Sequence, residues 1–179
     1  MMAHTRDFEA LVLPHLDAAY NLARWLVRDE HVADDMVQDA CLRAYRYFDA
    51  LRGDAAKPWL LGIVRNNCYA WLEEERMSAR WVAHGADDAL LAAVPVPPDS
   101  RGATPETELW HADRRQMVDA AIRALEPPYR EVIVLRELED LSYAEIAQIA
   151  AIPIGTVMSR LSRARAALRT ALADLLGTE

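Results

Sequence analysis

The stretch Leu141–Leu168, LSYAEIAQIAAIPIGTVMSRLSRARAAL, constrains the fold more than any other part of the sequence. It opens with Ser142 in a Ser-x-x-Glu capping box, which marks the start of a helix. Pro153 cannot continue that helix, and it disfavours helical angles at the residue before it. We therefore expect two short helices joined by a tight turn, with the second helix beginning around Gly155 or Thr156.

The second of these helices carries two distinct faces. Its apolar residues recur at spacings of three and four, which predicts a continuous stripe against a core. They are Val157, Leu161, Ala164, Leu168, Ala171, Leu172 and Leu175. A polar face near the N-terminal end holds Thr156, Ser159, Arg160 and Arg163.

This polar face is typical of a helix-turn-helix, whose second helix enters the DNA major groove by its N-terminal end. There arginine can pair bidentately with guanine, and hydroxyl side chains can contact bases or phosphates. Arg165 and Arg169 lie round the helix, where we expect phosphate contacts. The alternative is that all these arginines form a solvated surface.

The net charge of −8 over 179 residues argues against a protein that coats nucleic acid by bulk electrostatics. DNA contact would have to be local, or supported by a larger partner. The two cysteines, Cys41 and Cys68, match no metal or redox spacing, so we expect buried free thiols in a reducing compartment. No apolar run resembles a signal peptide or a transmembrane span, which predicts a cytoplasmic protein without membrane insertion.

Helical periodicity dominates the N-terminal half. Residues 8–27 predict a helix interrupted near Pro14, and residues 31–51 predict a second helix whose inner face includes Tyr47. The outer face of this second helix has acids early, bases late and an apolar residue between them. Its members are Asp35, Gln38, Asp39, Leu42, Arg43 and Arg46. Early acids and late bases suit the helix dipole, so a solvent face and a partner surface are equally compatible with the pattern.

A short loop over residues 49–57 precedes a long helix over residues 58–82, with Pro58 in its first turn. Five polar or aromatic residues lie off the apolar face of this helix. They are Trp59, Arg65, Asn66, Asn67 and Tyr69. Aromatic and amide groups interleaved with arginine can stack on unpaired bases and bond their edges, although the aromatic rings can equally cover neighbouring helices.

Residues 84–104 contain three prolines, two glycines and three aspartates, a composition that predicts a flexible linker. After it, a helix capped by Thr104 and burying Val118, a helix after the proline pair, and the helix-turn-helix make a four-helix unit. No strand pattern of comparable strength is present. The sequence therefore predicts an all-α fold of two small helical domains, residues 1–83 and 105–179, joined by a flexible linker.

Several motifs, in order along the chain, closely resemble extracytoplasmic-function (ECF) sigma factors, the smallest bacterial promoter-specificity subunits. They are DDMVQDACLRAYRYF, KPWLLGIVRNNCYAWLEEER, LEPPYREVIVLRELEDLSYAEIAQIA and IPIGTVMSRLSRARAAL. The resemblance covers nearly all of the chain apart from the linker and the termini. It implies a sigma-two-like and a sigma-four-like domain in an RNA polymerase subunit that is no enzyme and uses no cofactor or metal.

The resemblance also implies three binding surfaces. In the family, the helix like residues 34–48 docks on a coiled coil of the polymerase beta-prime subunit, a role that would fall to Asp35, Gln38, Asp39, Leu42 and Arg46. The separated strand of the minus-ten promoter element would be held by Arg52, Lys57, Trp59, Arg65, Asn66 and Asn67. The duplex minus-thirty-five element would be read by Ser142, Thr156, Ser159, Arg160, Arg163 and Arg165.

Further expectations follow from the resemblance alone. The polymerase beta flap would be another partner, and the linker would pass near the template and RNA path. An anti-sigma factor covering the polymerase- and DNA-binding faces would restrain the protein, with a stress or envelope signal releasing it. Ala151 stands where many relatives have glycine, at a cost of about 1 kcal/mol if a left-handed angle is needed, and Met158 stands where relatives are often basic.

Two alternatives come from other classes. A transcriptional regulator with a sensing domain would need a ligand cavity or phosphoacceptor in residues 1–80, and the sequence suggests neither. A helical metalloenzyme could draw on Asp34, Asp35, Asp39, Glu73, Glu74 and Glu75 with His31 or His84. Consecutive acids point to different sides of a helix, however, and the sequence has no His-x3-His pair.

Overall fold

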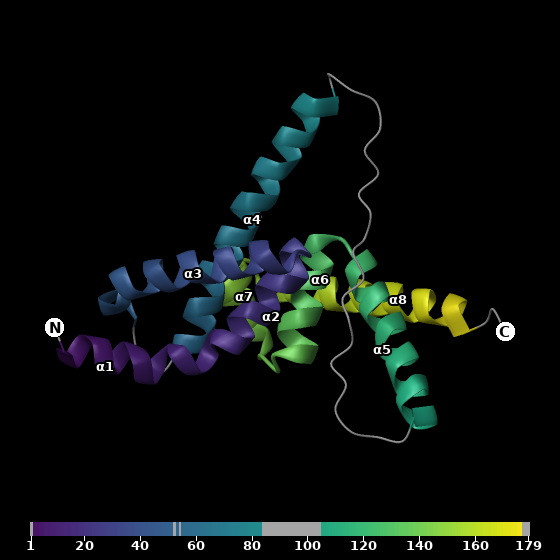
Figure 1. Cartoon of the computed structure of the whole chain (residues 1–179), viewed down its shortest axis with the longest axis horizontal. Helices are drawn as coiled ribbons and strands as arrows, with labels where there is room; N and C mark the ends of the chain where they lie inside the picture. Colours follow the sequence, from purple (N-terminus) through teal and green to yellow (C-terminus); the bar gives the residue numbers. More distant parts are fainter. Residues whose placement is uncertain (1, 52, 54, 84–104, 177–179) are drawn as a thin grey trace.

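A computed structural model describes the backbone of residues 2–51, 53, 55–83 and 105–176, and the side chains within 7–79 and 114–173 apart from positions 52 and 54. These ranges contain helices and turns and no β-strand, which confirms the predicted all-α class. Figure 1 shows α1 (Met2–Leu11), α2 (Leu16–Val27), α3 (Glu30–Arg46), α4 (Ala56–Ala83), α5 (Pro105–Ala124), α6 (Pro127–Ile133), α7 (Tyr143–Ala150) and α8 (Ile154–Leu176). Short 3-10 turns are η1 (Leu13–His15) and η2 (Phe48–Ala50), and η3 (Val134–Leu138) is a π-helical turn.

The N-terminal half is built around α2, α3 and α4, each of which contacts the other two. The face of α3 in this contact is made of small residues that let the helices approach closely. These are Ala33, Ala40 and Ala44, all 0% exposed. The predicted break near Pro14 is confirmed, because α1 ends at Leu11 and η1 carries the proline. The ring of Phe8 then meets Tyr45 and Phe48 edge-on, at centroid distances of 5.2 and 5.5 Å.

The predicted capping box opens α7 in the C-terminal half. Ser142 Oγ accepts from the Glu145 N–H at 3.2 Å, and the Glu145 carboxylate accepts from the Ser142 N–H at 2.8 Å. These bonds hold the pKa of the Glu145 carboxyl below its usual value, because they favour the charged form. α7 ends at Ala150, and its C-cap Ala151 has a left-handed φ of 53° and ψ of 45°, so the condition under which alanine costs about 1 kcal/mol relative to glycine is met.

The π-helical turn η3 differs from the continuous helix predicted over residues 129–137. Val134 and Leu135 of the turn are 0% exposed, so the wider turn keeps them in the core. Arg136 Nη1 donates to the Leu141 carbonyl at 2.8 Å and secures the end of the turn. The turn leaves Glu139 beside the N-terminal half, where it takes part in the contacts described below.

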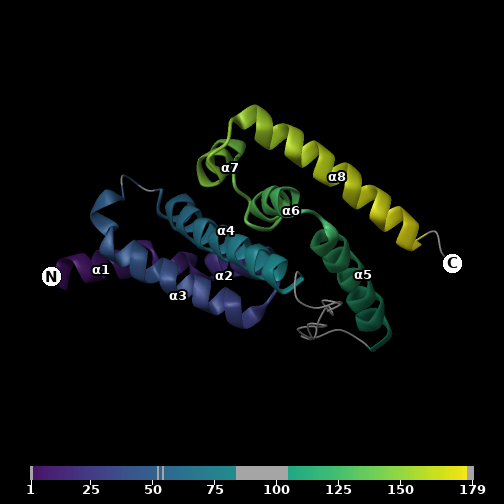
Figure 2. The ribbon, with the colours of Figure 1, turned by 90° about the horizontal axis from the view of Figure 1, so that it is seen from above.

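The two halves pack against each other, with α4 beside α7 and α2 beside α6 (Figure 2). One cluster of buried side chains extends through both halves. It includes Leu60 and Leu61 of α4 and Ile146 of α7, all 0% exposed. The sequence predicts two helical domains, but it contains no indication of this contact between them.

Some side chains lie elsewhere than predicted. Tyr47 is 66% exposed because α3 ends at Arg46 and Tyr47 leaves the helix with a φ of −110°. Val118 of α5 is 40% exposed because the buried residues described on this helix, Ala121 and Ile122, fall near its C-terminal end.

Cys68 is buried and Cys41 half-buried, and both thiols are free. Burial raises the pKa of the Cys68 thiol to about 12. The predicted linker over residues 84–104, which includes the predicted cap Thr104, lies outside the described residues. None of the helices that the structure describes is long and apolar enough to cross a membrane.

Candidate functional site

The start of α8 presents the polar face predicted to contact DNA. Ser159 and Arg163 are exposed, whereas Thr156 and Arg160 are half-buried. The Ser159 hydroxyl donates to the Thr156 carbonyl at 3.0 Å, which fixes its orientation on the helix. The exposed Met158, at 54%, lies on the same first turns, where a basic side chain would have added charge.

Two other residues predicted to contact the minus-thirty-five element have partners within the protein. Arg165 donates from Nε and Nη2 to one carboxylate oxygen of Glu137, at 3.1 and 2.7 Å. Hydrogen bonds to Glu137 and Tyr143 raise the pKa of the Arg165 guanidinium above its ordinary value. The Ser142 hydroxyl oxygen caps α7 by accepting from the Glu145 N–H, so in this conformation the side chain stabilises the helix.

An open groove of about 670 Å³ lies along α8, between this helix and the α6–α7 region. Its lining includes the apolar side chains Ile133, Leu161 and Leu168 together with the cations Arg165 and Arg169. A groove of mixed apolar and basic lining can accept a partner helix or strand whose own face is apolar and acidic. Of the residues that the sequence predicts to contact DNA, Arg165 and Arg169 line this groove.

The outer face of α3 is accessible. Its exposed members are Asp35, Gln38, Leu42 and Arg46. Leu42 is 61% exposed and gives this charged helix face an apolar contact point. Asp39 is half-buried and accepts from Arg43 Nε at 2.8 Å and from Asn67 Nδ2 at 3.0 Å. Four of the five predicted polymerase-binding residues are therefore free to meet a partner, and Asp39 is shared with the fold.

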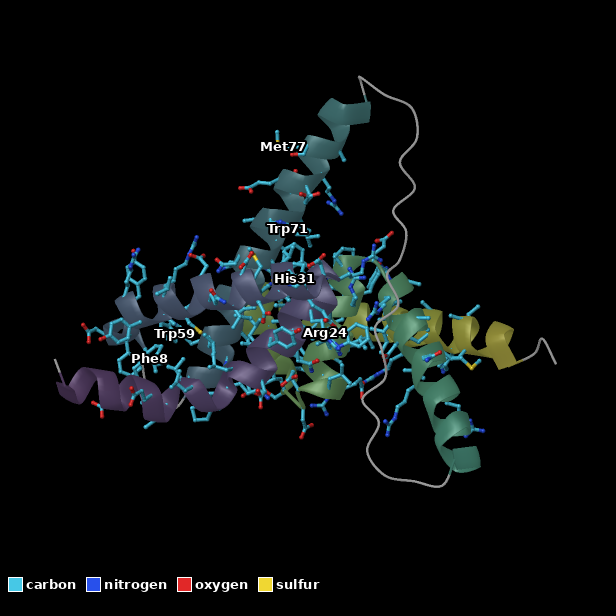
Figure 3. The ribbon with its side chains drawn as sticks, viewed as in Figure 1. Phe8, Arg24, His31, Trp59, Trp71 and Met77 are labelled. Carbon is cyan, nitrogen blue, oxygen red and sulfur yellow. The ribbon has the colours of Figure 1, made fainter. Side chains whose placement is uncertain are left out.

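The residues predicted to hold the minus-ten strand are less accessible. Asn67 is 6% exposed and donates to the Met36 carbonyl at 3.2 Å, so it belongs to the α3–α4 packing and not to an outer face. The sequence misplaces it because α4 is covered on more than one side, by α2 and α3 and also by α7. Trp59 packs half-buried against the core, and Figure 3 shows it within the helix bundle. Asn66 is exposed, and Arg52 lies outside the described residues.

Arg65, a further member of this set, is paired with a carboxylate of the other half. Glu131 of α6 is 0% exposed and accepts from Arg65 Nε and, at 3.1 Å, from the Tyr69 hydroxyl. The Arg65 guanidinium also lies over the Tyr69 ring, 4.4 Å from its centroid. Burial raises the pKa of Glu131 above its usual value, against the opposing effect of Arg65. Arg160 lies near enough to act on the same carboxylate, so helix α8 adjoins this cluster.

Lys57 is held by a second acidic residue, Glu139. Lys57 Nζ lies 3.1 Å from the Glu139 carboxylate and donates to the Glu139 main-chain carbonyl at 2.9 Å. Asn21 Nδ2 of α2 donates to the same carboxylate at 2.7 Å. Both cations that the sequence assigns to single-stranded DNA within the described residues of α4 therefore face carboxylates of the C-terminal half.

Sequence reasoning missed Glu131, Glu139 and Asn21. A weak indication of Glu131 exists, because it adjoins the buried run that begins at Val132, and a buried acid needs a basic partner. Its partner Arg65 is 66 residues away, and no spacing rule links positions so far apart.

The acids proposed for the metalloenzyme alternative do not converge. Within the ranges whose side chains are described, no group of three or more His, Cys, Asp or Glu residues could hold a metal ion. Asp39 instead bonds to Arg43 and Asn67.

Comparison with known proteins agrees with this division into an N-terminal helical region and a C-terminal helix-turn-helix. Residues 11–77 match the family described as Sigma-70 region 2, and residues 115–168 match Sigma-70, region 4. Among curated relatives, RNA polymerase sigma-H factor of Pseudomonas aeruginosa is 32% identical over 188 aligned positions, covering 96% of this chain and 89% of that protein. ECF RNA polymerase sigma-E factor of Escherichia coli K12 is 37% identical over 148 positions, covering 79% of this chain and 74% of that protein.

Solved structures give the same result. The sigma factor RpoE of Bartonella quintana, in complex with the anti-sigma factor NepR, superposes with a TM-score of 0.77 at 28% identity, covering 93% of this chain and 97% of that one. CnrH in complex with the cytosolic domain of CnrY gives a TM-score of 0.62 at 25% identity, covering 95% and 90%. These matches define a transcription initiation factor. The chain belongs to the sigma-70 family of RNA polymerase sigma factors, in its extracytoplasmic-function (ECF) group.

Proposed function

We propose that this chain directs core RNA polymerase to specific promoters by dividing recognition between its two halves. The N-terminal half, residues 1–83, binds polymerase through α3 and the separated minus-ten strand through α4. The C-terminal half, residues 105–179, reads the duplex minus-thirty-five element through α7 and α8. The observation that carries this proposal is the accessible α3 face with Leu42 61% exposed, in a chain that also ends in a basic helix-turn-helix.

The division explains how an acidic chain can act on DNA. Polymerase supplies much of the affinity, so local basic groups such as Arg160 and Arg163 are sufficient for recognition despite the net charge of −8. Strand opening needs no catalytic residue, metal or cofactor of the chain. A base that has left the stack is captured by contacts that offset a cost of a few kcal/mol.

The described conformation supports an order of events. Arg65 and Lys57 are engaged by Glu131 and Glu139, while the outer face of α3 is free. Polymerase therefore meets an accessible surface first, and the two halves separate before α4 takes up DNA. When the halves separate, Arg65 and Lys57 exchange a carboxylate partner for a DNA phosphate of the same charge. The electrostatic cost of separating the halves is therefore low.

Two further partners belong to the same proposal. The groove of about 670 Å³ along α8 is apolar enough to accept the polymerase beta flap. An anti-sigma factor restrains the chain until a stress or envelope signal arrives, by analogy with the two structural neighbours, which were solved with anti-sigma factors. Core RNA polymerase works in the bacterial cytoplasm, so the proposed function belongs there too.

The test is co-elution of the purified chain with core RNA polymerase, followed by transcription from genomic fragments. We expect co-elution and initiation at defined promoters. Leu42→Asp should abolish co-elution, whereas Arg160→Ala should retain it and lose recognition of duplex minus-thirty-five DNA. A chain that bound duplex DNA but never core polymerase would instead be a conventional regulator. Loss of the same step in both variants would refute the assignment of faces.

A further inference from the structure

Four arginines gather where the N-terminal half meets α5 and α6. They are Arg24 and Arg28 from the end of α2, Arg123 from the end of α5 and Arg130 from α6. We call this group the arginine junction. Figure 3 labels Arg24, which lies on α2 near the neighbouring helices of the C-terminal half.

The guanidinium groups of the junction are close together. Arg130 Nη1 and Arg28 Nη1 both donate to the main-chain carbonyl of Arg123, at 2.7 and 3.2 Å. The two nitrogens are therefore no more than about 6 Å apart. The guanidinium carbons of Arg24 and Arg123 lie 5.8 and 5.9 Å from the centroid of the Trp25 ring, so four cations surround one carbonyl and one indole.

No carboxylate balances this charge within the described side chains. The ion pairs there involve Arg43, Lys57, Arg65 and Arg165 and none of the junction arginines. Acids lie near the junction arginines along the chain. Glu131, directly after Arg130, accepts from Arg65 and Tyr69 instead. Asp29, directly after Arg28, accepts from the Val32 N–H as the α3 cap, and Glu30, Asp119 and Glu126 are exposed.

Two buried donors at the junction lack partners. Arg130 is 3% exposed, yet its Nε has no hydrogen-bond acceptor, and neither does Nε1 of Trp25, which is 5% exposed. Buried donors of this kind normally have a partner, and each unpaired one requires an explanation. Burial, and after it the neighbouring Arg28 and Arg123, lower the pKa of Arg130 to about 10, against the opposing effect of Tyr69.

The backbone at Arg28 adds a separate observation. Arg28 ends α2 with a φ of 62° and a ψ of 18°, the left-handed region in which glycine is the usual residue. An arginine there is strained relative to glycine, so the fold alone does not favour it. Its side chain is what places a cation of the N-terminal half beside Arg123 and Arg130.

We propose that the arginine junction is an anion site that binds a phosphate group, free or carried by a nucleotide, between the two halves of the chain. Convergent guanidinium forks match the several oxygens and multiple charge of phosphate better than the single charge of a carboxylate. Trp25 is too buried to stack on a base, so the site recognises the phosphate and not the nucleoside. Because Arg28 belongs to one half and Arg123 and Arg130 to the other, the bound anion favours the packed arrangement. This inference does not depend on the proposed sigma function.

The experiment uses the full chain and three probes, inorganic phosphate, pyrophosphate and ATP, against sodium chloride at matched ionic strength. We expect saturable binding of pyrophosphate by calorimetry and a rise in Tm of about 3 °C or more at saturation. Equal affinity for pyrophosphate and ATP would support the proposal that the site contacts only the phosphate groups. Clearly tighter binding of ATP would identify a nucleotide as the source, and would contradict the exclusion of the base.

Arg28→Gly is the decisive variant, because glycine suits the left-handed backbone and the chain should remain folded. We expect its pyrophosphate affinity to fall at least about tenfold. Arg115→Gln, which removes an exposed arginine of α5 outside the junction, is the matched control and should bind as the parent chain does. Binding that is unchanged in Arg28→Gly, or a Tm rise that sodium chloride reproduces, would overturn the proposal. A short acidic peptide that binds more tightly than pyrophosphate would overturn the assignment to phosphate.

Discussion

The outer face of α3 and the face of α4 that carries Lys57 and Arg65 belong to the same half, yet they differ in accessibility. On α3, Asp35, Gln38, Leu42 and Arg46 are exposed. On α4, Arg65 and Lys57 are bound to Glu131 and Glu139 of the other half. The first surface is available in the packed chain, and the second is covered.

The difference follows from what each face offers a neighbouring helix. α4 combines long cationic side chains with aromatic rings such as Tyr69, and these can be buried if a carboxylate accompanies them. The α3 face is mostly polar and carries charges of both signs, so the rest of the chain gains little by covering it. The composition of each face thus favours leaving α3 exposed and burying α4, and the carboxylates Glu131 and Glu139 of the other half make that burial possible.

The largest predicted effect comes from removing the buried carboxylate. Glu131→Ala leaves Arg65 and Tyr69 without their partner, which should destabilise the packed arrangement by about 3 kcal/mol. We expect a larger radius of gyration in solution scattering and tighter binding of single-stranded minus-ten DNA by the free chain. Polymerase affinity should not decrease, because α3 is untouched. An unchanged radius with circular dichroism like that of the parent chain would show that Glu131 does not hold the halves together.

Glu131→Gln removes the charge at this position and keeps the size and shape of the side chain. Burial raises the folded-state pKa of Glu131 above its ordinary 4.5, so the packed form takes up a proton that the separated form releases. Packed-form stability should therefore fall as pH rises from about 4.5 to the raised pKa, and remain level above it. The glutamine variant should lose this slope in unfolding experiments across that range. Persistence of the slope would assign it to another group.

The α3 face is tested by Leu42→Asp, which puts a charge at the centre of the proposed polymerase contact. Leu42 is 61% exposed, so the free energy of unfolding should change by less than about 0.5 kcal/mol. Polymerase affinity should fall by about thirtyfold or more, a loss of at least about 2 kcal/mol. Asp35→Asn, a milder change on the same face, provides a graded comparison. Normal polymerase affinity in Leu42→Asp would leave α3 as a solvent face.

Glu139→Gln should have a smaller effect than Glu131→Ala. Lys57 keeps its bond to the Glu139 main-chain carbonyl at 2.9 Å, and Asn21 can still donate to the side-chain oxygen. We expect a loss of about 1 kcal/mol in the packed form, with DNA binding by the free chain improved slightly. Lys57→Ala is the matched variant, because it breaks the same contact but also removes a proposed DNA ligand. Improved DNA binding in both would argue that Lys57 does not touch DNA.

Ala151→Gly affects neither face and should have the smallest effect, in the stabilising direction. The φ of 53° at Ala151 costs alanine about 1 kcal/mol relative to glycine, offset in part by the flexibility of glycine in the unfolded chain. We expect a Tm rise of a few degrees and unchanged binding to polymerase and DNA. A fall in Tm would show that the left-handed turn is not strained.

Much of the fold could be predicted from local chemistry. The Ser142 capping box, the break at Pro14 and the break at Pro153 are each decided within a few residues, and all three appear in the structure. The π turn could not be predicted, because it depends on keeping Val134 and Leu135 buried against distant helices.

The candidate site divides in the same way. The sequence by itself determined the all-α class, the helix-turn-helix with its basic face, and the charged outer face of α3, because helical period and capping are local properties. Only the tertiary structure decided that Asn67 is buried, that Glu131 and Glu139 pair with Arg65 and Lys57, and that four arginines gather at the Trp25 ring and the Arg123 carbonyl. Such pairings join residues that are far apart in the chain. They form because the residues are buried in the same interface, and no local sequence pattern encodes that interface.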